Sequence, residues 1–167
     1  MFTLTVEKNM KIILLITTLL IFPLYSSAHK FEAKYAIIEH PWMKIFNTNG
    51  VGYFKIKNIS SYNLYLMGAV SKDVKKIELH KVTMEDDIAK MRPLEGGLEI
   101  KVGEIIELKP MSFHLMFFGI NKDYEEGQMM GVELIFKSME NHFLENLENL
   151  NVKFKVDMSK STHQHDH

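Results

Sequence analysis

Residues 105–118 read IIELKPMSFHLMFF, two short apolar runs on either side of a Lys-Pro turn. The runs 105–108 and 113–118 are almost uniformly apolar, which is typical of β-strands that are covered on both faces. Lys109-Pro110 between them has the chemistry of a tight turn. This stretch therefore predicts two successive strands within a β-structure.

Short strands and turns extend over most of the remaining chain. Several further runs are strand-like, and some of them alternate apolar and polar residues, as half-buried antiparallel strands do. These runs are Tyr35–Ile38, Val51–Lys57, Leu64–Val70, Lys76–Val82, Val132–Phe136 and Val152–Val156. Turn-forming residues such as Asn47-Thr48-Asn49-Gly50 and Gly96-Gly97 separate them. The pattern predicts a single all-β domain, either a sandwich or a barrel.

Segment 138–151 departs from this pattern. Its apolar residues Phe143, Leu147 and Leu150 fall at i, i+4 and i+7, which is the spacing of a weak helical stripe. We therefore expect a surface loop with about two helical turns in this segment.

The N-terminus has the layout of a secretory signal peptide. Lys8 and Lys11 flank the start of an apolar run of 11 residues, which Pro23 ends before the small residues 26–28. An uncleaved membrane anchor is the alternative, but a span needs roughly 20 residues.

Cleavage after Ala28 would divide the chain into three parts. We expect residues 1–28 to be the signal peptide, 29–158 to be the mature domain and 159–167 to be a flexible tail.

The composition limits the chemistry that is available. The 167 residues include 12 Met and no Cys, so disulfides and a lipid-modified cysteine are both excluded. The formal net charge of −1 gives no reason to expect nucleic acid or a membrane surface as a partner. Thioethers bind Cu(I) well, and they do not form disulfides in an oxidising compartment as thiols do.

Two imidazoles and two thioethers form a candidate metal-binding set. Ten residues separate His80 from Met91, and 22 separate Met91 from His114, which is followed at i+2 by Met116. Residues at i and i+2 of a strand share a face, so His114 and Met116 can bind one ion, while Met91 is expected in a loop before Pro93. Taken singly, a Met is more often core packing and a His is more often a satisfied surface or core residue.

The spacing and its surroundings resemble a known family. Segment 77–120 contains Glu78-Leu79-His80, Met91-Arg92-Pro93 and Phe113-His114-Leu115-Met116. It is similar to the periplasmic copper chaperone family PCu(A)C, whose pattern is H-x10-M-x21/22-H-x-M. Trp42 and Gly52-Tyr53-Phe54 also look like early strands of that family. Pro110-Met111-Ser112 departs from it, because family members often have Pro-Gly-Gly there.

The resemblance implies a fold, a ligand set and a role. The fold would be a single-domain, cupredoxin- or immunoglobulin-like antiparallel β-sandwich with Greek-key connections. His80, Met91, His114 and Met116 would bind one Cu(I). The protein would work in the periplasm and deliver copper to the dinuclear copper centre of cytochrome c oxidase or to another copper carrier. We further expect a monomer that is not inserted in the membrane after signal cleavage.

The C-terminal tail offers a second histidine cluster. His163, His165 and His167 alternate along a polar segment, and imidazole suits Cu(II). The alternative is a solvated tail with incidental metal affinity.

Other functions use the same residues differently. The chain could sequester or buffer copper without a dedicated acceptor, or it could be an immunoglobulin-like binding module with these His and Met residues in its core. If cleavage exposes His29, its amine and imidazole would resemble the histidine brace of copper oxygenases. We find no nucleophile elbow, phosphate loop or zinc-protease motif, and we therefore expect a protein that is not an enzyme.

Overall fold

The computed structural model describes residues 30–158 except 87 and 141–142. Every regular element among them is a strand, so the described residues contain no helix that could span a membrane. The strands are β1 (Lys30–Glu32), β2 (Ala36–Phe46), β3 (Asn49–Asn58), β4 (Asn63–Val70), β5 (Val74–Glu85), β6 (Ile88–Pro93), β7 (Leu98–Ile100), β8 (Ile105–Leu108), β9 (Phe113–Ile120), β10 (Met129–Glu140), β11 (Phe143–Asn146) and β12 (Leu150–Val156). The predicted signal peptide and tail lie outside the described residues.

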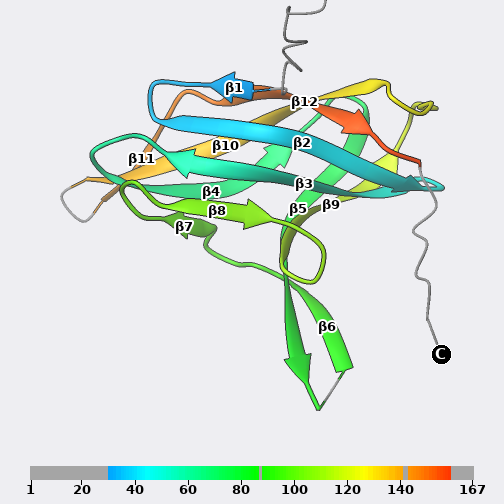
Figure 1. The fold of residues 1–167 in the computed structure, drawn as a ribbon, viewed down its shortest axis with the longest axis horizontal. Helices are drawn as coiled ribbons and strands as arrows, with labels where there is room; N and C mark the ends of the chain where they lie inside the picture. The colour runs from blue at the N-terminus through cyan, green and yellow to red at the C-terminus, as the bar shows by residue number, and fades with distance from the viewer. Residues whose placement is uncertain (1–29, 87, 141–142, 159–167) are drawn as a thin grey trace, which may run out of the picture.

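The strands form two layers that belong to one continuous hydrogen-bonded sheet (Figure 1). The order is β6-β5-β9-β3-β2-β12-β10-β4-β7, so that most neighbours are distant in sequence, as crossovers between the layers of a β-sandwich require. One layer passes into the other through β2 and β12, which pair in parallel at Lys155↔Trp42 and Val156↔Met43. The other strand pairings of the described residues are antiparallel, so the predicted antiparallel sandwich is confirmed except where β2 pairs with β12.

Alternation along the strands builds the core. In β12, Leu150, Val152, Phe154 and Val156 are buried while the intervening residues are exposed. Phe154 contacts the rings of Phe54 from β3 and Phe117 from β9, at centroid distances of 5.8 and 5.9 Å. Burying side chains of this size is the main source of stability in a domain without disulfides.

The structure confirms the predicted all-β class, and each of the eight predicted strands coincides with an observed one. The helical turns expected in 138–151 are wrong, because β10 runs to Glu140 and β11 folds back against it. Leu150 belongs to the period-two pattern of β12, not to a helical stripe.

A long hairpin projects from this body. Strand β6 and the end of β5 extend beyond the other strands (Figure 1), and they pair from His80↔Pro93 to Glu85↔Ile88. The hairpin leaves the sheet at the point where β5 also pairs with β9. This junction positions the candidate site.

Candidate metal centre

His80 and His114 are direct cross-strand partners on β5 and β9. Directly opposite residues of an antiparallel pair project from the same face, and the two ring centroids lie 5.7 Å apart. Both residues are buried, His80 with 9% and His114 with 3% of its surface exposed. Their neighbours Leu79 and Leu115 belong to the core, so the two imidazoles occupy the opposite face of the sheet.

Met116 continues this face along β9. It pairs with Glu78, which lies two residues before His80, so the pairs His80↔His114 and Glu78↔Met116 are adjacent on one face. Met116 is half-buried.

Met91 reaches the same face from the projecting hairpin. It lies in β6 opposite Val82, which is two residues beyond His80, so Met91 is diagonal to His80. The loop expected around Met91 is therefore wrong, because the residue is part of a strand. Its side chain is 63% exposed. The pairing of β6, β5 and β9 thus brings all four candidate ligands to one face.

The hydrogen bonds of His114 leave one ring nitrogen with a free lone pair. Nδ1 lies 3.2 Å from the backbone carbonyl oxygen of Ser112, which can only accept, so Nδ1 carries the proton. Nε2 is buried and has no hydrogen-bond partner. Burial lowers the pKa of His114, and the nearby His80 lowers it further, although the bond to Ser112 opposes this shift. A neutral imidazole with an unpaired buried nitrogen is what a metal ligand requires.

His80 is held by a carboxylate. Its Nε2 lies 2.9 Å from Oε2 of Glu78, while Oε1 of Glu78 lies 2.5 Å from Nζ of Lys76. The bonds to Lys76 and His80 lower the pKa of Glu78, which keeps the carboxylate ionised and accepting. In the neutral tautomer that donates from Nε2, Nδ1 of His80 keeps its lone pair. Sequence reasoning assigned no role to Glu78, although its i−2 spacing from His80 placed it on the same strand face.

Aromatic rings surround the two histidines. Tyr53 lies 6.4 Å from His114 between ring centroids, Phe118 lies 6.2 Å from His80, and Trp42 stacks on Tyr53 at 4.6 Å. Both histidines therefore have an aromatic neighbour.

The donor set determines which ions could bind. Two neutral imidazoles and two thioethers suit a soft monovalent ion such as Cu(I). Among the described residues, no group of three or more His, Cys, Asp or Glu side chains is arranged to hold a metal. This part of the chain therefore offers no such cluster of carboxylates to a hard ion such as calcium or magnesium. The tail histidines His163, His165 and His167 and the candidate brace residue His29 lie outside the described residues.

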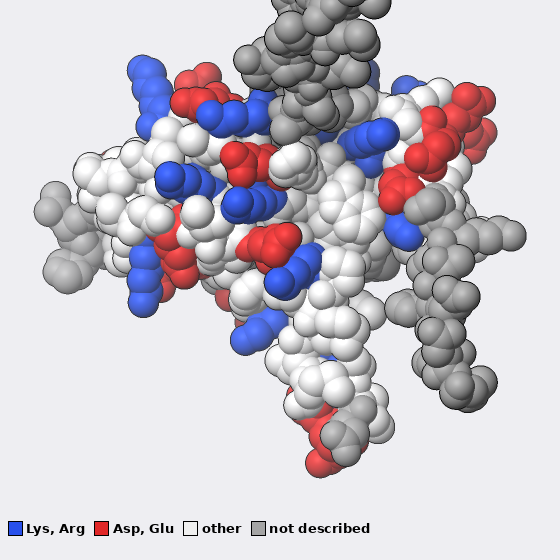
Figure 2. All heavy atoms as spheres, in the orientation of Figure 1, with Lys and Arg blue, Asp and Glu red and all other residues white. Residues whose placement is uncertain are grey.

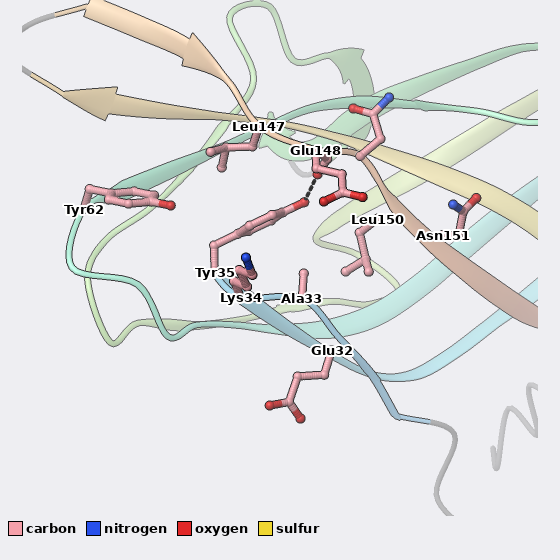
Figure 3. Close-up of a pocket in the computed structure, with 10 residues that line it drawn as sticks. Glu32, Ala33, Lys34, Tyr35, Tyr62, Leu147, Glu148, Leu150 and Asn151 are labelled. Carbon is pink, nitrogen blue, oxygen red and sulfur yellow. Dashed lines mark hydrogen bonds between the residues drawn. The ribbon is translucent and has the colours of Figure 1, made fainter.

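A pocket of about 600 Å³ lies elsewhere on the molecule (Figure 3). It is lined by segments 32–35 and 147–151 together with Tyr62. The Tyr35 hydroxyl donates to the backbone carbonyl of Glu148 across it, and burial raises the pKa of Tyr35 to about 12. Because its lining holds no imidazole or thioether, this pocket does not match the soft-donor chemistry.

Known protein structures share this architecture. The copper-bound PCuAC domain from PmoF2 superposes with a TM-score of 0.61 at 18% identity, covering 78% of this chain and 98% of that one. The apo PCuAC domain from PmoF1 gives 0.60 at 16% identity, with 78% and 99% covered. The fold is therefore a cupredoxin-like β-sandwich, and the face that carries His80 and His114 gives it a neutral, soft donor set.

Sequence comparison places the chain in a particular family. A family model described as "Putative lipoprotein LpqE-like" matches residues 37–145, more than half of the chain, and the protein belongs to this family. The match includes all four candidate ligands. A relative from Leifsonia xyli subsp. xyli (strain CTCB07), itself named a "Putative lipoprotein", is 26% identical over 100 residues. That alignment covers 59% of this chain, and the chain spans about 60% of the length of this curated relative.

Proposed function

We propose that the protein is an exported copper chaperone that binds Cu(I) through His80, Met91, His114 and Met116. The observation that carries this proposal is the buried Nε2 of His114, which has no partner although His80 lies beside it. An unpaired buried nitrogen costs about 1–3 kcal/mol, and a bound ion would offset that cost. A structural neighbour that is a copper-bound domain supports the same choice of metal.

The exposure of the ligands favours delivery over storage. His80 and His114 are buried, whereas Met91 is 63% exposed on the projecting hairpin. A partner could approach Cu(I) from the Met91 side and exchange one ligand at a time. A protein that only sequesters copper would gain from burying all four ligands. We therefore favour a carrier over a copper buffer and over a catalyst.

The remaining parts of the chain complete this proposal. Residues 1–28 would direct export to the periplasm and be removed, leaving domain 29–158. His163, His165 and His167 in the tail 159–167 would bind Cu(II). The acceptor would be a copper site such as that of cytochrome c oxidase, or another carrier, and the chaperone would act as a monomer.

Competition for Cu(I) tests the ligand assignment. The mature protein is titrated against a chromogenic Cu(I) chelator, and we expect one tightly bound ion per chain. His114→Ala and Met91→Leu should each lower the Cu(I) affinity by more than about tenfold, because each removes a ligand.

Met43→Leu is the matched control, since Met43 is fully buried in the core on β2 and is not a candidate ligand. Circular dichroism would show that each variant is folded. Parental Cu(I) affinity in both ligand variants would contradict the proposed site.

A further inference from the structure

Met84 is a fifth soft donor on the face of the candidate ligands. It pairs with Ala89 near the tip of the β5–β6 hairpin, two residues beyond Val82 and four beyond His80. Alternate residues of a strand share a face, so Met84 projects with His80. Met91, opposite Val82, is diagonal to both of them, and diagonal neighbours are about 7–8 Å apart, within reach of long side chains. The hairpin thus presents Met84, Met91 and His80 in sequence along one face.

Exposure changes steeply along this series. Met84 is 61% and Met91 63% exposed, whereas His80 and His114 are 9% and 3% exposed. Two large thioethers in water gain little from packing, so burial does not account for them. An ion arriving from solvent would meet the two methionines before the two imidazoles.

The charged side chains Glu85, Lys90 and Arg92 lie on the other face of the hairpin. Glu85 accepts from Nζ of Lys90 at 2.6 Å and from Nη2 of Arg92 at 3.4 Å, which places these three side chains together. Val82, opposite Met91, and Ala89, opposite Met84, complete the face that carries Met84, Met91 and His80 (the soft face), and both are uncharged. In Figure 2 the side of the projecting hairpin that is turned to the viewer is mostly uncharged, with acidic side chains at its tip. A monovalent cation on the soft face therefore avoids the Lys and Arg charges.

We propose that Met84 and Met91 form an outer, two-thioether position for Cu(I), and that Met91 is shared with the inner position at His80, His114 and Met116. This inference rests on the proposed function. Cu(I) would move by ligand exchange: the bond to the Met84 sulfur breaks as a bond to an imidazole nitrogen forms. The ion keeps its oxidation state, and Met91 holds it throughout. The outer position offers two donors and the inner position four, so the outer position would speed transfer and add little affinity.

Methionine methyl resonances report on each thioether separately. The protein is labelled with ¹³C at the methionine methyl groups and titrated with Ag(I), a soft monovalent cation that undergoes no redox change. We expect the Met91 and Met116 methyls to shift during the first equivalent. The Met84 methyl should shift with them in fast exchange, or as further Ag(I) is added.

Transfer kinetics give the second measurement. Cu(I)-loaded protein is mixed with an excess of chromogenic chelator, and release is followed by stopped flow. Met84→Leu keeps an apolar side chain of similar volume and removes the thioether. We expect release to slow several-fold while the equilibrium Cu(I) affinity stays at the parental value.

Met139→Leu is the matched control, because Met139 is another exposed thioether but lies on β10. It should leave the release rate unchanged. If the Met84 methyl does not respond and Met84→Leu releases Cu(I) as fast as the parent, the outer position is refuted while the carrier function stands. If Met91 and Met116 are also silent, the proposed function itself fails.

Discussion

At the scale of single residues, two acceptors orient the candidate imidazoles: the Glu78 carboxylate for His80 and the Ser112 carbonyl for His114. The sequence pattern predicted two His and two Met as ligands, and it predicted that His114 and Met116 share a face. It could not identify Glu78 and the Ser112 carbonyl as the acceptors that fix the ring protons. A backbone carbonyl carries no sequence signature, and its position follows only from the turn that precedes β9.

Glu78 should matter for copper binding without being a ligand. Glu78→Gln keeps the shape of the side chain but removes the charge that holds His80, so we expect the Cu(I) affinity to fall by about tenfold. The measurement is the same chelator competition. Glu107→Gln is the matched control, because Glu107 is exposed on β8 and pairs with Lys109. Equal losses in both variants would mean that net charge alone is responsible.

At the scale of strands, the sequence predicted eight of the observed strands and missed β1, β6, β7 and β11. Strand β6 has no buried residue, and its order comes from pairing with β5, which is not visible in a local window. Strand β7 is only three residues long. The alternation of buried and exposed residues in β12 begins at Leu150. The helical prediction was wrong because it counted Leu150 as part of a helical stripe.

The side chain of Asn58 forms hydrogen bonds that connect the ends of several strands, so its removal tests how these strands are held together. It is fully buried at the end of β3, and its Nδ2 donates to the carbonyls of Tyr62 at 2.8 Å and Ile100 at 2.9 Å. Its Oδ1 accepts from the Ser60 amide at 2.9 Å. Asn58→Ala would leave these groups unpaired, so we expect the free energy of unfolding to fall by about 2–4 kcal/mol.

Urea denaturation followed by circular dichroism would measure this loss. Asn149→Ala is the control, because Asn149 makes its hydrogen bond to Glu133 at the exposed surface. Its effect should be within about 0.5 kcal/mol of zero. A similar loss in both variants would contradict the role given to Asn58.

At the scale of the whole molecule, burying a neutral histidine makes the stability of the copper-free protein depend on pH. The folded pKa of His114 lies below its usual value of 6.5. Between these two values the unfolded chain binds more protons than the folded one, so stability falls as the pH drops below 6.5. Above that value His114 is neutral in both states, so this loss of stability is absent.

We therefore expect the urea midpoint of the copper-free protein to decrease as the pH is lowered from about 7.5 to 5, and to decrease less in His114→Gln. Parallel titration of the imidazole protons by NMR would show whether His114 stays neutral below its usual pKa. An unchanged slope in the variant would assign the acid sensitivity to other groups.

The direct pairing of His80 with His114 would also make binding of an ion depend on the register of the sheet. A slip of one residue between β5 and β9 would turn one imidazole toward the core, because the side-chain period of a strand is two. A cation bridging the two rings would therefore fasten neighbouring strands in their correct register. Release of that cation to an acceptor would weaken the contact between β5 and β9, so that the loaded and empty forms would differ in rigidity more than in shape.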